Sequence, residues 1–476
     1  MNFSPIRANI RRRAAVSAAA FLGFLTAVGL RAAEPGAPLC KDCNVVLISL
    51  DALQAAHVHS LGCARNTTPN FDRLAARGTL FTQAVSPASW TLPASMSWFT
   101  GLEPTLHGVV NKFTTFSSEK AVISHVRDTA LPGTRTLGEV FSAAGYAAAG
   151  FTGDAGVNGI FGFKEGFEVY SDSVPPFSGL ARSVPPAAQW LRKNKDRRFF
   201  LFLHGYDVHG QAFPEGGLDN RFVPKDYAGP FTGSPAQQRQ LRERGLAQGS
   251  LGLSAQDVDF WRAAYDEKAQ RMDERLGEFL RVLEETGVSS RTIIVALSDH
   301  GTELLEHGRL DHGFTLYDEL VRVPLAIVCP GTAPRKLVRE QVGTLALFST
   351  LLDLTGVRPA SLPKEQLSEP SLAPLLTGEG AGRDVYMETD YRLFARKRGL
   401  RTSDGWKFVR GFDDGSRELY DLNKDPGETV DLFSREPERA RELEARLLAH
   451  YRRLGADLEK RAWTPGCLPV YGDQCR

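Results

Sequence analysis

Three apolar segments that lie far apart in the chain each end at acidic or imidazole side chains. The segments cover residues 44–50, 198–203 and 292–298, and the residues that follow them are Asp51, His204 and the pair Asp299-His300. Continuous apolar runs of this length are typical of central parallel strands that helices cover on both faces. Parallel strands end together at one edge of an open sheet, which is where such sheets bind ligands. The chain therefore predicts an α/β fold with a polar site at that edge.

Helices are predicted between these strands. Apolar residues recur at helical spacing in segments 70–78, 136–145 and 257–286, and the last segment carries charged residues on its other face. Residues 210–250 are rich in Gly, Pro, Gln and Arg. We interpret them as a surface insertion that frames the cleft.

The chain changes character after about residue 375. Short segments separated by turns predict a small antiparallel sheet, and an amphipathic helix follows them. The predicted strands cover residues 385–389, 397–401, 406–409 and 418–422, and the predicted helix covers 436–454. We expect a catalytic α/β domain over residues 34–375 and a C-terminal subdomain over 376–476.

Residues 1–33 are typical of an export signal. Four arginines precede an apolar run over 14–30, and Arg31-Ala32-Ala33 follows it. The arginine triplet is also compatible with twin-arginine export, and an uncleaved membrane anchor is the alternative. We therefore expect a periplasmic or secreted protein, with the membrane involved only through an uncleaved signal segment.

The charge balance limits the partners. The formal net charge is +1, which argues against a general nucleic-acid-binding protein. A small-molecule substrate is compatible with this balance, because net charge does not report on clefts.

Cysteine usage also fits an exported protein. Of six cysteines, four lie near the ends of the chain after the signal segment, at positions 40, 43, 467 and 475. Disulfides are typical of exported proteins. Two local loops and two bridges between the ends are both compatible with this spacing, and a metal or redox Cys-x-x-Cys site is the alternative for the first pair. Cys63 and Cys329 are predicted to be buried apolar residues.

Residues 89–101 place a hydroxyl at the start of a short buried helix. Pro93 falls in the predicted first turn, Gly101 offers a stop, and Thr91 lies at the start. By itself this pattern favours a helix cap. A helix start also attracts phosphate or sulfate, however, because its backbone N–H groups are free.

The strand-end residues change the interpretation of Thr91. Asp51, Asp299 and His300 are ligands suited to a divalent cation such as Ca, Mg, Mn or Zn. A threonine hydroxyl on such a metal loses its proton more easily and becomes a nucleophile. His209 and His312 are candidates to hold the substrate oxygens or to protonate the leaving group.

The motifs, taken together, resemble the sulfatase family of the alkaline phosphatase superfamily. The amino-terminal matches are Asn44–Asp51, Asn66-Thr67-Thr68-Pro69-Asn70 through Ala75, Thr91-Leu92-Pro93 through Gly101, and His107-Gly108. Downstream matches are Ser298-Asp299-His300-Gly301, Glu306-His307-Gly308, Leu316–Glu319, Arg322–Leu325, Glu418–Leu422 and Asp425–Glu428. The resemblance implies a mixed, mostly parallel sheet between helices, with a small antiparallel C-terminal subdomain.

The resemblance also implies roles for individual residues. Asp51, Asp299 and His300 match the metal-binding positions, and Thr91 matches the nucleophile. His209 matches a substrate or leaving-group histidine, and His312 falls where the family has a second cationic or proton-donating side chain. Asn111, Lys112 and His204 complete the predicted site as substrate-binding residues. A second metal on Asp207, His209 and His312 is the alternative to a single ion.

The chain departs from the family pattern within the nucleophile motif and at the residue after Asp51. Sulfatases have a Cys or Ser that is converted to formylglycine within Cys/Ser-x-Pro-Ser-Arg, whereas this chain has Thr91-Leu92-Pro93-Ala94-Ser95. Formylglycine is therefore not expected, and Ala52 stands where a second Asp is usual. Superfamily members with an unmodified Thr act on phosphate esters.

We therefore predict a metal-dependent hydrolase or transferase that uses in-line attack by Thr91 on a phosphate or sulfate ester, with a phosphodiester or phosphomonoester preferred. The expected substrate is a small-molecule or envelope-derived ester. Sulfate-ester hydrolysis is the first alternative, and a catalytically silent envelope binding protein is the second.

Overall fold

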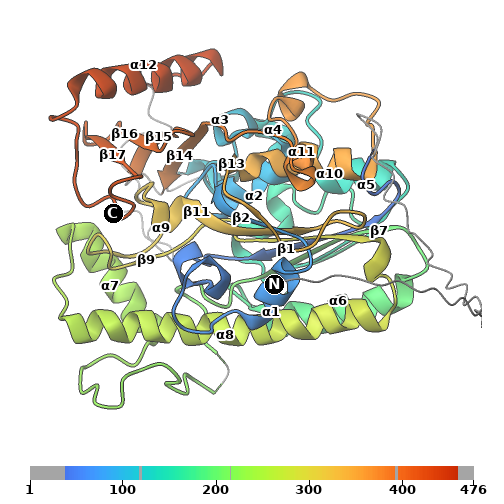
Figure 1. Ribbon diagram of the computed structural model, residues 1–476, viewed down its shortest axis with the longest axis horizontal. Coiled ribbons are helices and arrows are strands. Elements are labelled where there is room, and N and C mark those ends of the chain that lie inside the picture. The colour runs from blue at the N-terminus through green and yellow to red at the C-terminus, as the bar shows by residue number, and fades with distance from the viewer. Residues whose placement is uncertain (1–37, 117–120, 215, 392–394, 459–476) are drawn as a thin grey trace, which may run out of the picture. The chain divides into compact units, whose positions relative to one another are not determined.

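A nine-stranded sheet forms the centre of the molecule. The computed structural model describes residues 38–116, 121–214, 216–391 and 395–458 (Figure 1), so the predicted signal segment, Cys467 and Cys475 lie outside the described residues. The strand order is β12-β2-β11-β8-β1-β7-β5-β6, and β13 also pairs with β2. The strands are β1 (Asn44–Leu50), β2 (Thr79–Val85), β5 (Ala147–Phe151), β6 (Val169–Ser171), β7 (Phe199–Gly205), β8 (Thr292–Leu297), β11 (Arg322–Val328), β12 (Lys336–Val338) and β13 (Val342–Gly343).

The three predicted apolar strands lie next to one another. β1 pairs in parallel with β7 on one side and with β8 on the other. Ser49 of β1 is in register with His204 of β7 and with Leu297 of β8. The carboxyl ends of all three strands therefore reach the same edge, as the sequence predicts.

Helices cover both faces of the sheet (Figure 1). Side chains of β1 alternate between the two apolar cores, with Val45 and Leu47 on one face and Val46 and Ile48 on the other. The first face carries α2 (Thr91–Thr100), α5 (Leu137–Ala143), α10 (Leu347–Thr355) and α11 (Ala373–Thr377). The second carries α1 (Pro69–Ala75), α6 (Leu180–Asn194) and α8 (Ala255–Glu285).

Most predicted helices have nearly the expected bounds. Thr136 caps α5 through a capping box with Glu139. The predicted insertion 210–250 differs from expectation, because it contains a 14-residue helix, α7 (Pro235–Gln248). Smaller elements are α3 (Pro104–His107), α4 (Val126–Thr129), α9 (Asp318–Val321), β3 (Phe113–Phe116), β4 (Ala121–Ile123), β9 (Glu303–Leu304) and β10 (Leu310–Asp311).

The C-terminal part forms an antiparallel sheet covered by a helix. The sheet has the order β14-β15-β16-β17. Its elements are β14 (Val385–Tyr391), β15 (Ala395–Arg401), β16 (Trp406–Gly411), β17 (Arg417–Asp421) and α12 (Pro437–Arg453). Leu443 and Leu447 of α12 pack on Phe408 and Leu419 of the sheet. The predicted fold class is therefore confirmed in both of its parts.

Buried ion pairs attach this sheet to the start of α9. Lys407 is fully buried, and its Nζ lies 3.0 Å from Asp318 Oδ1 and 2.8 Å from Glu428 Oε1. Arg401 also pairs with Asp318, at 2.9 Å. Because the loss of one partner would leave a buried charge without compensation, these side chains depend on one another.

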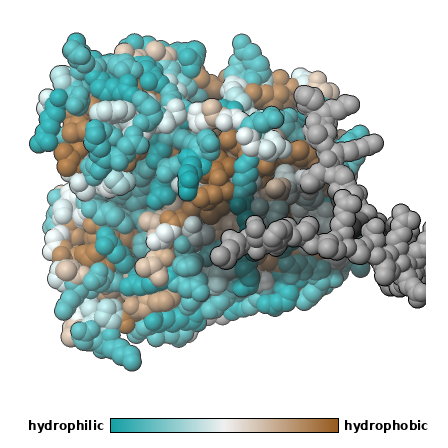
Figure 2. Space-filling model, in the orientation of Figure 1, coloured by the Kyte–Doolittle hydropathy of each residue, from teal (hydrophilic) through white to brown (hydrophobic). Residues whose placement is uncertain are grey.

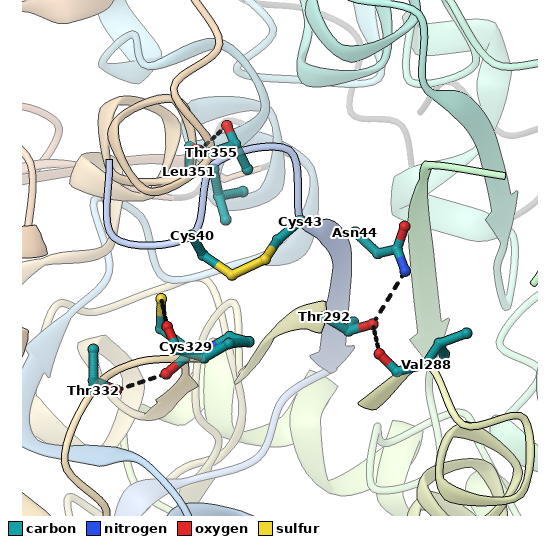
Figure 3. Close-up of a disulfide and its surroundings, with 10 residues drawn as sticks. Cys40, Cys43, Asn44, Val288, Thr292, Cys329, Thr332, Leu351 and Thr355 are labelled. Carbon is teal, nitrogen blue, oxygen red and sulfur yellow. Dashed lines mark hydrogen bonds between the residues drawn. A yellow bond between two sulfur atoms is a disulfide. The ribbon is translucent and has the colours of Figure 1, made fainter. Parts of the chain in front are cut away.

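The cysteine pair near the start of the described chain forms a local disulfide. Cys40 is bonded to Cys43, beside the buried Cys329 and the end of α10 (Figure 3). This pairing excludes a Cys-x-x-Cys metal site there, and it excludes bridges from these two residues to the C-terminal cysteines. Cys63 differs from expectation because it is partly exposed.

Most large apolar side chains of the described residues are buried. Hydrophilic side chains cover most of the face shown in Figure 2, and apolar ones gather in a band across its middle. Within the described ranges, none of the helices has the length and apolar character needed to cross a membrane.

The His307–Glu319 pair predicts a pH-dependent stability. His307 Nδ1 lies 2.5 Å from Glu319 Oε1, and its Nε2 lies 3.2 Å from the Glu428 carbonyl oxygen. Burial alone would lower the pKa of His307, but Glu319 outweighs burial and raises that pKa from 6.5 to about 9. The pair's stabilisation is therefore complete below pH 6.5 and is lost as pH rises through 9, by about 3 kcal/mol at most.

Denaturant unfolding at pH 6, 7.5 and 9.5 measures this effect. We expect His307→Gln to destabilise the protein at pH 6 and to have little effect at pH 9.5. His59→Gln is the control, because His59 forms an exposed pair with Asp72, and exposed pairs contribute little. An equal cost of His307→Gln at all three pH values would contradict the prediction.

Candidate active site

Two aspartates from neighbouring strands form the floor of the site. Asp51 follows β1, Asp299 follows β8, and both side chains are fully buried. Asp299 Oδ1 accepts the backbone N–H groups of Ala52 (3.2 Å) and His300 (3.0 Å). Asp51 Oδ1 and Asp299 Oδ2 have no hydrogen-bond partner within the described part of the chain. Buried carboxylate oxygens without donors are the expected ligands of a cation.

His204 adds an imidazole to this pair. Its Nε2 lies 3.3 Å from Asp51 Oδ2, and neither ring nitrogen has a hydrogen-bond partner among the residues described. One ligand atom from each of Asp51, His204 and Asp299 lies within 4.8 Å of the other two. This set fits a divalent cation. The structure thus groups His204, predicted to bind substrate, with the carboxylates of the candidate metal site.

His300 borders the same group in one defined orientation. Its Nδ1 lies 2.7 Å from the carbonyl oxygen of Gly301, which fixes the proton on Nδ1. Its Nε2 therefore presents a lone pair, 3.8 Å from Asp299 Oδ2 and 4.0 Å from Asp51 Oδ1.

Thr91 is directed into this group and does not cap its helix. It is the first residue of α2, and no side chain caps that helix. The Thr91 hydroxyl donates to Asp51 Oδ2 at 3.0 Å and lies 3.2 Å from His300 Nε2. Gly156 packs against it so closely that an added Cβ would lie 2.8 Å from Thr91 Cβ. The hydroxyl therefore has two neighbouring proton acceptors and a restricted position.

Burial and mutual electrostatic interactions shift the pKa values of the two aspartates and of the two histidines beside them. Burial, followed by the repulsion of Asp299, raises the pKa of Asp51 well above its ordinary range. Burial also opposes the charge of Asp299, but His300 and His204 outweigh it and lower the pKa of Asp299. Burial lowers the pKa of His204 to about 4, and it lowers that of His300. Both imidazoles are therefore neutral at pH 7, as metal ligation requires.

His209 and His312 lie beside His300. The ring centroids of His300 and His312 are 4.4 Å apart, and those of His312 and His209 are 4.7 Å apart. His209 Nδ1 accepts the backbone N–H of Gln211 at 3.4 Å, which leaves Nε2 as its donor. His209 also stacks on Phe177, at 5.0 Å between centroids. A row of three imidazoles thus forms one side of the site.

Other predicted site residues have structural contacts. Asp207 Oδ2 accepts the backbone N–H of Leu180 at 2.8 Å, at the start of α6, so the structure does not bring its carboxylate to the predicted second metal site with His209 and His312. The Asn111 amide donates to the carbonyl oxygen of Asp390 at 2.9 Å. The next residue, Lys112, is half-buried. Substrate binding by Asn111 and Lys112 stays a prediction.

Sequence reasoning missed three residues around the site. Tyr206 is buried beside His204, and its hydroxyl accepts the backbone N–H of Gly156 at 2.7 Å. Asp311 contacts His312, and Arg242 of α7 contacts Asp311. Tyr206 and Asp311 adjoin predicted site residues in sequence, a signal that could have found them. Arg242 has no such signal, because it lies within the predicted surface insertion.

A hydroxyl set among buried carboxylates and imidazoles, at the carboxyl edge of a mostly parallel sheet, forms a candidate hydrolase site. The chain belongs to the sulfatase family. The family model described as Sulfatase matches residues 43–357, and the model described as N-sulphoglucosamine sulphohydrolase, C-terminal, matches residues 305–454. It is thus a sulfatase-family ester hydrolase, a family that typically depends on a metal.

Individual relatives agree with this assignment. A Delta 4,5-hexuronate-2-O-sulfatase of Bacteroides thetaiotaomicron is 24% identical over 437 residues, covering 85% of this chain and 87% of the relative. A solved 2-O GAG sulfatase is similar with a TM-score of 0.68 and 23% identity, covering 87% of this chain and 93% of the other. The phosphonate monoester hydrolase of Agrobacterium radiobacter has a TM-score of 0.67 and 20% identity, with coverages of 87% and 96%.

Two of the departures from the family pattern lie on segments that form the site, Ser95 on α2 and Ala52 next to Asp51. Ser95 lies one turn further along α2, and its buried hydroxyl has no hydrogen-bond partner in the described ranges. Ala52 directly follows Asp51 and adopts a left-handed backbone conformation with φ of 59°.

Proposed function

We propose that this protein hydrolyses the sulfate ester of a small sugar-type substrate by in-line attack of Thr91 Oγ1. The observation that carries the proposal is the position of the Thr91 hydroxyl, 3.0 Å from Asp51 Oδ2 and 3.2 Å from His300 Nε2. Both atoms accept protons, so the hydroxyl can lose its proton as it attacks. A divalent cation on Asp51, Asp299 and His204 supplies positive charge that favours the alkoxide and the transition state.

The reaction has two displacements. In the first, the bond between Thr91 Oγ1 and sulfur forms, and the bond between sulfur and the leaving oxygen breaks. The hydroxyl proton passes to His300 Nε2, and the imidazole row gives one proton to the oxygen of the leaving alcohol, so that the row gains and loses one proton. In the second, a water oxygen attacks the sulfur and the bond between sulfur and Thr91 Oγ1 breaks. One water proton passes through His300 to Oγ1 and restores the hydroxyl, and hydrogensulfate leaves and loses its proton to solvent. His209 Nε2 is a donor to the ester oxygens in both steps.

The relatives support sulfate over the phosphate preference that the sequence favours. Sulfatase names dominate among them, and two of those compared above act, by name, on 2-O-sulfates. Phosphoryl transfer is the second candidate, because unmodified Thr91, Ser95 and Ala52 depart from the formylglycine site, and a phosphonate monoester hydrolase shares the fold. We further propose one bound cation, no formylglycine, and export to the periplasm or medium, which the Cys40–Cys43 disulfide supports.

Esters with one shared leaving group test this proposal. The metal-loaded protein, prepared with Ca, Mn or Zn, is assayed on 4-nitrophenyl sulfate, 4-nitrophenyl phosphate, bis(4-nitrophenyl) phosphate and a 4-nitrophenyl phosphonate. We expect the highest kcat/KM on the sulfate. A higher value on any phosphorus ester would favour the second candidate. Inactivity on all four esters, with metal bound, would favour a silent binding protein.

A further inference from the structure

A buried chain of three charged or polar residues leads from α7 to the imidazole row. Arg242 Nη1 lies 3.2 Å from Asp311 Oδ2. Asp311 Oδ1 accepts the backbone N–H of His312 at 3.0 Å and also lies 2.6 Å from His312 Nδ1, a charge contact at a ring nitrogen that has no hydrogen-bond partner within the described residues. Each of these side chains is at most 5% exposed. The guanidinium of Arg242 thus holds the carboxylate of Asp311, and this carboxylate contacts one side of the His312 ring.

The backbone holds Asp311 in a conformation that must be stabilised by its surroundings. Asp311 has a φ of 103°, which is unfavourable for a residue with a side chain. Such backbone strain persists only where contacts with surrounding residues hold the main chain in place. Strained residues of this kind are frequent at functional sites. Here the neighbours are close, because a Cβ on Gly210 would lie 2.5 Å from Gln238 Nε2 and 3.2 Å from Asp311 Oδ2. Gln238 and Arg242 lie one turn apart on α7.

This arrangement orients the ring of His312. With Nδ1 at Asp311, the opposite nitrogen, Nε2, is the one available to a substrate. The ring itself lies between those of His209 and His300, with centroids at 4.7 and 4.4 Å. A turn of the ring would separate Nδ1 from Asp311.

The positive groups around Asp311 also oppose a second cation there. Lys268 is buried, and its Nζ donates to the carbonyl oxygens of Ala212 (2.8 Å) and His209 (3.4 Å). Because Arg242 Nη1 lies 3.2 Å from Asp311 Oδ2, positive charge already faces Asp311. The single candidate metal group among the described residues is the one at Asp51, His204 and Asp299.

We propose that Asp311, held by Arg242, is a positioning residue that orients His312 toward the scissile ester. The inference rests on the proposed function only for the identity of the ester. It assigns to α7, within the predicted surface insertion, a part in the reaction. Asp311 acts through His312, and Arg242 acts through Asp311.

Kinetics of single and double variants test whether Asp311 acts through His312. The substrate is the ester class that the wild type hydrolyses. We expect Asp311→Asn to lower kcat by about 10- to 100-fold, a part of what a positioned acid or base contributes, with KM changed by less than about 2-fold. In the His312→Gln background, Asp311→Asn should lower kcat no further. Arg242→Lys, which keeps the charge and loses the planar fork, should give a smaller loss.

A matched control exists elsewhere in the chain. Asp266 is buried between His57 Nδ1 and Arg65 Nη1, each at 2.5 Å, which repeats the Arg–Asp–His chemistry outside the imidazole row. Asp266→Asn should combine multiplicatively with His312→Gln. A multiplicative loss for Asp311→Asn with His312→Gln would overturn the proposal, as would a loss confined to KM.

A measurement without substrate separates this proposal from the proposed function. In protein labelled with ¹⁵N-histidine, the His312 signals are assigned by their loss in His312→Gln. We expect Nδ1 of His312 to carry the proton in the wild type, and Asp311→Asn to shift these signals. Unchanged signals would overturn the positioning role even in an active enzyme, whereas inactivity on all esters with shifted signals would contradict only the proposed function.

Discussion

Replacing Thr91 by alanine is expected to lower kcat/KM by about 10³-fold or more, because removal of a nucleophile leaves only the contribution of substrate binding and charge. The structure places the Thr91 hydroxyl against both Asp51 and His300. The metal content and the fold should be unchanged. Steady-state kinetics on the preferred 4-nitrophenyl ester measures the effect.

Two further variants make this result specific. Thr91→Ser keeps the hydroxyl and should retain activity within about 10- to 100-fold of the wild type, since it loses only the methyl group that fixes the rotamer. Thr100→Ala removes a buried hydroxyl at the other end of α2, where it bonds to the Met96 carbonyl oxygen at 2.7 Å. It should leave kcat near the wild-type value. Equal activity of Thr91→Ala and the wild type would exclude Thr91 as the nucleophile.

Removing the metal is expected to have the second large effect. Chelation should abolish activity and lower the thermal midpoint, because a ligand at 100 times its Kd stabilises the folded state by about 2.7 kcal/mol. Asp51→Asn should bind metal weakly and lose this response. The metal-free Asp51→Asn protein should be at least as stable as the metal-free wild type, because the variant relieves repulsion between two buried carboxylates. Metal analysis and thermal unfolding, with and without chelator, measure both effects.

The same measurements show whether His204 binds the metal or the substrate. If it is a metal ligand, as its position suggests, His204→Ala should reduce the bound metal below one per chain. His209→Ala is the matched control, since His209 belongs to the imidazole row and should change kinetics while the metal content stays the same. Full metal content in His204→Ala, with a raised KM, would restore the substrate-binding role predicted from the sequence.

Much of the fold was predictable because local patterns agreed with the final packing. The apolar runs that precede Asp51, His204 and Asp299 are long enough to be strands and are apolar on both faces, so they could only be central. Their parallel pairing then brings those residues to one edge. The C-terminal strands were recognisable for the opposite reason, since turns separate them at short intervals.

The parts that were not predictable depend on contacts between distant segments. Nothing local distinguishes Asp207, which binds the start of α6, from an acid that binds metal. The burial of Arg242 depends on how α7 packs against β10, and an arginine on a polar helix is typically exposed. The position of His204 close to the two carboxylates depends on strand register and ring orientation, because neighbouring histidines at strand ends look alike in sequence.

The left-handed backbone at Ala52 has an evolutionary consequence. Alanine adopts this conformation at a cost, whereas aspartate and asparagine tolerate it better. Position 52 therefore still has the main-chain geometry suited to the acidic residue that is usual in the family, although the side chain is absent. A single nucleotide change from an alanine codon to an aspartate codon would return the carboxylate to a backbone already shaped for it. The main chain at position 52 is thus compatible with a carboxylate introduced by Ala52→Asp.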